Sequence, residues 1–138
     1  MIIVVDTNVL LVSISSRSKY HWLYRFILDK KVQVAFTHDI LIEYEEQISI
    51  HWHHDIAVNT VRSLTELSTS LFTKVYYNLR LITVDEDDNK FVDCAFAANA
   101  DFIVTNDHHF NILKNVDFPS IPILNINEFR DLLEKNIK

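Results

Sequence analysis

The stretch "MIIVVDTN", residues 1–8, decides the fold, because a run of β-branched apolar residues leads straight into an aspartate. Residues 2–5 show no polar alternation, which is typical of a strand buried on both faces of a parallel sheet covered by helices. In such sheets, ligands bind outside the carboxyl ends of the strands. Asp6 is therefore predicted either to belong to a site at that edge of the sheet or to cap the turn or helix that follows.

Strands and helices are predicted to alternate along the rest of the chain, which indicates an α/β fold with a parallel sheet. Apolar runs predict further strands at residues 32–37, 102–105 and 121–125, with 81–84 either a short strand or an extended connection. Apolar spacing predicts helices at residues 19–30, 39–50, 85–100 and 126–138, a short helical or loop segment at 10–16, and two helices within 55–80 that break near 68–70. No linker or repeat interrupts the pattern, so we expect one domain over residues 1–138.

The composition excludes several ways of handling phosphate. The 138 residues are 49% hydrophobic and 23% charged, which is typical of a globular protein. The chain has no glycine, and this excludes a P-loop and a Gly-rich dinucleotide motif, because both need glycines to bring backbone amides close to phosphate. The formal charge of −6 argues against a generic basic surface, so contact with nucleic acid would need cations to mediate it.

The cysteine content and the hydropathy pattern indicate a cytoplasmic protein. Cys94 is the single cysteine and lies among apolar residues, so it is predicted to fill the core rather than act as a nucleophile. One cysteine cannot form an internal disulfide, which fits a reducing compartment. The first apolar run ends at Asp6, too early for a signal peptide, and no segment approaches the ~18 apolar residues that span a bilayer.

Four acids are predicted to converge at one end of the sheet. Asp6 and Asp107 follow predicted strands, Asp88 lies at the start of the helix before residues 102–105, and Glu43 lies in the first turns of the helix after residues 32–37. Clustered carboxylates raise one another's pKa unless cations compensate them. Oxygen ligands of this kind suit Mg²⁺ or Mn²⁺, and two such ions about 3.5–4 Å apart can promote phosphodiester hydrolysis.

A simpler interpretation of these acids stays open. The run at residues 85–88 consists entirely of acids, which would be favourable at the start of a helix because of the helix dipole. Any one of them is equally well explained as part of a solvated loop or as an N-cap. The joint placement of Asp6, Glu43, Asp88 and Asp107 is what favours a metal site.

Three blocks of sequence resemble the PIN-domain nucleases, and in particular the VapC-like toxin components of toxin–antitoxin pairs. These blocks are "VVDTNVLL", "THDILIEYEE" and "DDNKFVDCAFAANADFIVTND", and they occur in the order expected for that family. The resemblance implies a three-layer α/β/α sandwich on a mainly parallel central sheet. It also implies a metal-dependent endoribonuclease that uses one or two Mg²⁺ or Mn²⁺ ions and leaves 5′-phosphate and 3′-hydroxyl ends. The implied partners are a second copy of the chain, in a homodimer, and a cognate antitoxin.

The resemblance assigns roles to individual residues. The positions that match the catalytic and metal-binding acids of the family are Asp6, Glu43, Asp88 and Asp107. Asn8 and Thr105 match positions that support those acids by hydrogen bonding. Asp93 matches an auxiliary acid, although it lies about 140° around a helix from Asp88. Relatives often have glycine where this chain has Asn106, a residue type that adopts a left-handed conformation more readily than most.

Other polar and aromatic residues are weaker candidates. Phosphate contacts are predicted for Arg17, Lys19 and Lys90, and a dimer interface for the apolar helices within 55–80. The histidines of "HWHH" (51–54) and "DHH" (107–109) are favoured as structural or surface residues over zinc ligands, with His108 and His109 as candidate substrate contacts. Most aromatic residues are expected in the core.

Two alternative functions are open at this point. A haloacid-dehalogenase-like phosphatase also places an aspartate after its first strand, but it needs a second aspartate two residues later, where this chain has Asn8. A catalytically silent PIN scaffold that binds RNA or a protein partner needs no intact set of acids. The four acids therefore favour the nuclease.

Overall fold

A five-stranded sheet forms the centre of the molecule, in the order β3–β2–β1–β4–β5. The computed structural model describes residues 1–136, and each neighbouring pair of strands in it is parallel, as predicted. The strands are β1 (Ile2–Val5), β2 (Gln33–Phe36), β3 (Ser70–Phe72), β4 (Phe102–Val104) and β5 (Ile123–Leu124).

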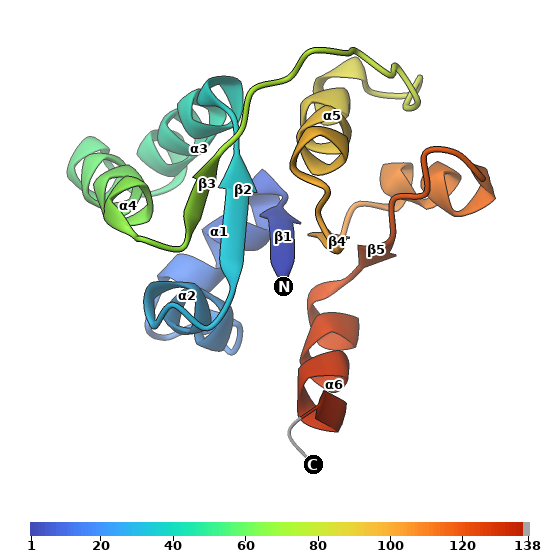
Figure 1. Cartoon of the computed structure of the whole chain (residues 1–138). Helices are drawn as coiled ribbons and strands as arrows, with labels where there is room; N and C mark the ends of the chain where they lie inside the picture. The colour runs from blue at the N-terminus through green and yellow to red at the C-terminus, as the bar shows by residue number, and fades with distance from the viewer. Residues whose placement is uncertain (137–138) are drawn as a thin grey trace.

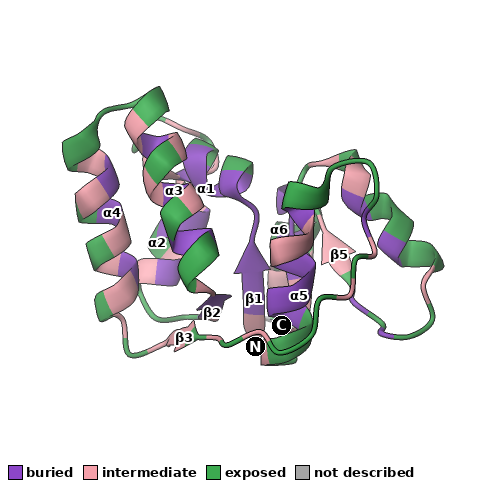
Figure 2. Cartoon of the chain, turned by 90° about the horizontal axis from the view of Figure 1, so that it is seen from above, coloured by how far each residue is buried: buried purple, intermediate pink, exposed green. Residues whose placement is uncertain are grey.

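Helices cover both faces of this sheet and produce the predicted three-layer α/β/α sandwich (Figure 1). The α-helices are α1 (Thr7–Ile14), α2 (His21–Leu28), α3 (His38–His51), α4 (His54–Glu66), α5 (Asn89–Ala98) and α6 (Ile126–Asn136). The connections from β1 to β2 and from β2 to β3 step in the same direction, so right-handed crossovers place α1–α4 on one face. The connection from β3 back to β4 steps the other way, and its helix α5 packs across β1, β2 and β4 on the opposite face (Figure 2).

Burial on both faces explains the apolar run of β1. Ile3, Val4 and Val5 are at most 1% exposed, because helices pack against the sheet from both sides. Cys94 on α5 is buried within the same core, as its apolar surroundings predicted. The central strand is therefore held in place over its whole length, and Asp6 extends directly from it.

The region 55–80 differs from the prediction of two helices. Only one helix, α4, forms there. The chain then continues into β3, which pairs with β2 at the edge of the sheet. Residues 73–85 contain no helix or strand. Side chains of α5 hold this segment instead, with Asp93 accepting from the Leu79 amide and Asn89 bonding both backbone groups of Ile82.

Within residues 1–136, three residues adopt a positive φ angle, although the chain has no glycine: Lys30, Arg80 and Asn99. Asn99 ends α5 in the left-handed conformation that glycine usually supplies at this position. Asn is among the residue types that tolerate this conformation best, so α5 ends cleanly in a chain without glycine. No helix within residues 1–136 is long and apolar enough to cross a membrane.

Candidate metal centre

The acids lie at the point where the strand order of the sheet reverses. From β1 the chain first builds outward to β2 and β3, and later places β4 and β5 on the other side of β1. Connections that leave neighbouring strands in opposite directions create a crevice at the carboxyl ends of those strands. Val5 pairs with Val104 in the register of β1 and β4, so Asp6 and Thr105 follow side by side.

Thr105 links the acids that follow these two strands. Its side chain is buried, and its hydroxyl donates to Asp6 Oδ2 over 2.8 Å. The same hydroxyl oxygen accepts from the Asp107 backbone N–H over 3.0 Å. One threonine therefore orients the Asp6 carboxylate and fixes the backbone of Asp107 beside it.

Asp6 is buried among other carboxylates. It precedes α1 at the N-cap position, but its side chain makes no capping hydrogen bond there. Burial raises the pKa of Asp6 to about 6, the Thr105 hydrogen bond opposes this, and the charges of Asp107 and Glu43 add to the rise. The capping interpretation of Asp6 therefore fails, and its carboxylate lies within the electrostatic reach of two other acids.

Glu43, on α3, has a partner for each of its oxygens. Lys90 Nζ lies 2.7 Å from its Oε1, and the Thr7 hydroxyl donates to its Oε2. Helix α3 is positioned by Thr37, whose side chain caps it by accepting from the Ile40 N–H over 3.2 Å. The Tyr44 hydroxyl also donates to the carbonyl of Val5, which joins α3 to the end of β1. The charge of Glu43 is thus compensated by the protein itself.

Asp88 is in a different situation. A short 3₁₀ turn, η1 (Glu86–Asp88), leads into α5, and Asp85 caps it by accepting from the Asp87 N–H over 3.1 Å. Asp88 is 9% exposed and does not cap α5 with its side chain. The pKa of Asp88 is raised to about 6, by burial most and then by the charges of Asp107, Asp85 and Asp6, while the interaction with His109 opposes the rise.

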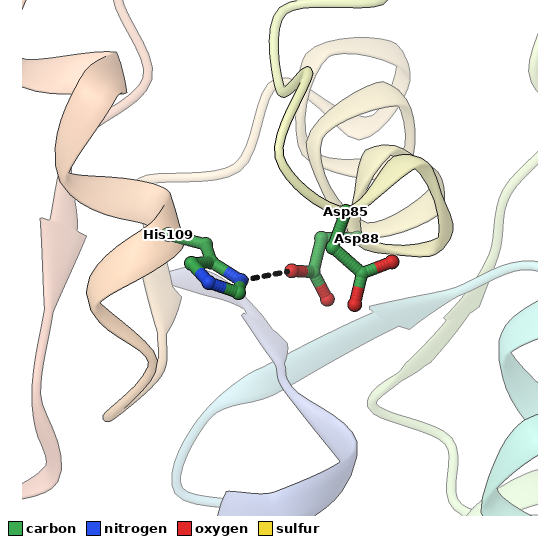
Figure 3. A group of neighbouring side chains, drawn as sticks. All are labelled: Asp85, Asp88 and His109. Carbon is green, nitrogen blue, oxygen red and sulfur yellow. Dashed lines mark ion pairs between the residues drawn. The ribbon is translucent and has the colours of Figure 1, made fainter.

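His109 faces Asp88 from the second 3₁₀ segment, η2 (His108–Asn115) (Figure 3). His109 Nδ1 lies 3.5 Å from Asp88 Oδ2 and 3.5 Å from Asp107 Oδ1. Both distances are too long for a good hydrogen bond, and Asp88 Oδ2 and His109 Nδ1 are buried without a hydrogen-bond partner. The Asp107 side chain is fixed nearby, because its Oδ1 accepts from the His109 backbone N–H over 2.9 Å.

These residues fit a divalent cation. Asp85, Asp88 and His109 can each offer one ligand atom, and the three atoms lie within 4.8 Å of one another. Buried carboxylates with raised pKa values and unpartnered polar atoms form an environment that positive charge would stabilise. The oxygen donors suit Mg²⁺ or Mn²⁺, and the ring nitrogen suits transition metals.

Several predicted site residues form no hydrogen bond or ion pair with these acids within residues 1–136. Asn8 is exposed and makes no side-chain hydrogen bond to another residue within 1–136. Asp93 is turned to the Leu79 amide, 3.0 Å away. Arg17 and Lys19 follow the far end of α1, whose eight residues span about 12 Å. Asn106 does not take up the left-handed conformation, and its side chain accepts from the Ile126 N–H over 3.2 Å.

The sequence interpretation missed the contributions of three residues. Thr7 was not considered, although it stands next to Asp6 and bonds Glu43. The sequence shows Asp85 only as one of a run of acids, and it favours a structural or surface role for His109 over a role as metal ligand. The signal for His109 was its position two residues after Asp107 in "TNDHHF", because a tight turn brings such neighbours together.

Comparisons with known proteins agree with this architecture. A family model described as "PIN domain" matches residues 2–109, a range that contains every acid named above together with His109. A solved structure, VapBC2 from Rickettsia felis bound to a DNA fragment from their promoter, is similar with a TM-score of 0.63. It is 19% identical, and the match covers 91% of this chain and 98% of that one, so the likeness supports the fold alone. No curated protein matches the chain.

Proposed function

Because the chain belongs to the PIN domain family, we propose that it is a metal-dependent endoribonuclease that hydrolyses RNA phosphodiester bonds. The observation that carries this proposal is the arrangement of carboxylates where the strand order reverses. Asp6 and Asp88 are buried there with raised pKa values, and Asp107 is tied to Asp6 through Thr105. Buried acids of this kind lower the stability of a metal-free protein, and a bound cation would compensate them.

Asp6, Glu43, Asp88 and Asp107 would hold one or two Mg²⁺ or Mn²⁺ ions. When bound, such ions activate water and offset negative charge on a phosphate during hydrolysis. Thr105 keeps Asp6 oriented through its hydroxyl. The burial of Asp6 limits competing water, which strengthens its electrostatic interactions.

Lys90 is the best placed of the predicted phosphate contacts. Its ammonium pairs with Glu43, and its side chain stays 25% exposed. It lines the groove between α3 and the start of α5, together with Glu43 and Glu86. An RNA phosphate that approaches the acids can therefore reach this ammonium, whereas Arg17 and Lys19 would contact RNA farther along its path. Hydrolysis would leave 5′-phosphate and 3′-hydroxyl ends.

The protein is proposed to act as the toxin of a toxin–antitoxin pair. The similar solved structure is of VapBC2, which supports an antitoxin as partner of this chain. A homodimer is proposed as well, with α4 and the exposed side chain of Phe72 as the interface within 55–80. Light scattering at working concentration tests the dimer, and a monomer would contradict it.

Cleavage of single-stranded and structured RNAs by the purified chain in Mn²⁺, Mg²⁺ and EDTA tests the nuclease. We expect cutting that needs metal and is lost in Asp6→Asn, while Asp29→Asn, which changes an exposed acid at the other end of the sheet, cuts normally. Cutting that survives Asp6→Asn would come from a contaminant or another site. A folded, metal-binding protein that cuts no RNA would support the silent scaffold instead.

A further inference from the structure

The ring of His109 lies between two carboxylates, within ion-pair distance of each but too far for a good hydrogen bond to either. Its Nδ1 is 3.5 Å from Asp88 Oδ2 and equally far from Asp107 Oδ1, and both Nδ1 and Asp88 Oδ2 are buried without a hydrogen-bond partner. A buried polar atom without a hydrogen-bond partner lowers the stability of the fold, because the atom has lost its hydration. Such an arrangement is stable only when something else satisfies these atoms.

The observed separations suit ligands of one shared cation better than hydrogen-bond partners. Hydrogen bonds between nitrogen and oxygen have lengths of about 2.7–3.2 Å. Two ligand atoms that each lie about 2.0–2.2 Å from a metal ion, at angles near 90–110°, are roughly 3.0–3.6 Å apart. The distances from His109 Nδ1 to Asp88 and to Asp107 fall in the second range.

Within residues 1–136, no lysine or arginine pairs with the acids on this side of the centre. Within residues 1–136, the ion pairs of Asp88 and Asp107 are with His109 alone, whereas Lys90 pairs with Glu43 on the other side. The unpartnered oxygen of Asp88, a residue only 9% exposed, is directed toward His109 (Figure 3). This buried oxygen is an indication of a ligand that is independent of the clustering of acids.

We propose that His109 is a nitrogen ligand of the metal centre, acting with Asp88 and Asp85, and that it makes the chain prefer Mn²⁺ and later first-row ions over Mg²⁺. The inference rests on the proposed function in placing a metal at this site. Imidazole binds transition metals well, whereas Mg²⁺ prefers oxygen ligands and retains its water. A site made only of carboxylates would discriminate less between the two ions.

The backbone of His109 and the buried Phe110 that follows it hold its ring ready for this role. The His109 N–H donates to Asp107 Oδ1 over 2.9 Å, and the next residue, Phe110, is fully buried. The ring of His108 packs edge-on against that of His109, with centroids 4.7 Å apart. His108 is itself exposed, so it provides a matched control for substitution of its neighbour.

Calorimetric titration of the metal-free full chain with Mn²⁺ and with Mg²⁺ tests the preference. We expect His109→Gln to weaken Mn²⁺ binding on the order of tenfold or more, the range seen when groups around a metal are removed. Mg²⁺ binding should change by less than about threefold, and His108→Gln should bind both ions like the wild type. Unchanged Mn²⁺ affinity in a folded His109→Gln protein would overturn the inference.

Electron spin-echo modulation of Mn²⁺ bound below one equivalent tests the ligand in the wild-type protein, without relying on a variant. Coupling to ¹⁴N is expected, and it should persist in His108→Gln. Bound Mn²⁺ without nitrogen coupling would overturn the inference about His109. The proposed function would still stand if RNA cutting needs metal and is lost in Asp6→Asn. Nitrogen coupling in a protein that cuts no RNA would support the inference and contradict the nuclease. No metal binding at all would overturn both.

Discussion

The two sides of the metal centre compensate their charge in different ways. On the α3 side, Glu43 has an ammonium on one oxygen and a hydroxyl on the other. On the α5 and η2 side, Asp88 faces His109 across 3.5 Å, and both leave a buried atom unpartnered. The protein thus pairs an ammonium with one side and places only the imidazole of His109 beside the acids of the other.

The start of α5 produces this difference. Lys90 follows Asp88 by two residues, which on a helix places the side chains about 200° apart. Lys90 therefore reaches toward α3, while Asp88 turns toward η2. The same helical turn supplies the cation that pairs with Glu43 and the carboxylate that remains unpaired.

The largest expected effect is on RNA cleavage, when one acid from each side of the centre is substituted in turn. Asp88→Asn removes a charge that pairs with no lysine or arginine within residues 1–136, so we expect kcat/KM for RNA cleavage to fall on the order of 10³-fold or more. Glu43→Gln removes a charge that Lys90 already offsets, and the expected loss is smaller, on the order of 10- to 100-fold. Cleavage rates at saturating Mn²⁺ measure both effects.

The control for this comparison is Asp29→Asn, which removes an exposed acid at the end of α2. It should cleave at nearly the wild-type rate. Equal losses for Asp88→Asn and Glu43→Gln would show that the two sides are equivalent in the loaded enzyme, and the comparison would then describe the metal-free state alone.

The second effect concerns the stability of the metal-free protein. Asp6 holds its proton more tightly in the folded chain, because burial raises its pKa from 3.8 to about 6. Its stabilising contribution is therefore complete below pH 3.8 and is lost as the pH rises through about 6. Urea unfolding in EDTA should give a free energy of unfolding about 1–1.5 kcal/mol lower at pH 7.5 than at pH 5 from this group.

Asp6→Asn separates this contribution from the titration of the histidines. The variant should be more stable than the wild type at pH 7.5 in EDTA and should lose about half of that advantage at pH 5. Asp29→Asn, at an exposed position, should leave the profile unchanged. Saturating Mn²⁺ should remove the destabilisation of the wild type, because a bound cation favours the ionised form. A variant that is less stable at both pH values would contradict the assignment.

The fold was predictable where burial dominates the pattern. The unbroken apolar run of β1 and the block from α5 to β4 predicted a covered parallel sheet, because few other arrangements bury such runs on both faces. The prediction of two helices within residues 55–80 was wrong, because β3 is short and lies at an edge of the sheet, where Phe72 is 64% exposed. Its strand pairing with β2 depends on a long-range contact that local apolar spacing does not reveal.

The site was predictable only as a list of acids at strand and helix ends. Sequence could not distinguish an acid that caps a helix from one that is left free, since Asp6 and Asp88 occupy N-cap positions without capping. It also could not reveal that Asp93 turns to the Leu79 amide. These differences depend on side-chain direction, which the packing around each helix start determines.

The smallest expected effect tests the compensated side through Lys90. Lys90→Met removes the ammonium 2.7 Å from Glu43, so a cation that competes with the metal for this carboxylate is lost. Because the pair is partly exposed, we expect Mn²⁺ affinity to rise only about three- to fivefold. RNA should bind more weakly in the same variant, since a phosphate contact is lost. Lys31→Met, which removes an exposed charge at the amino end of β2, controls for net charge. If both variants raise the affinity for Mn²⁺ equally, the effect comes from the change in net charge, and Lys90 does not compensate Glu43 specifically.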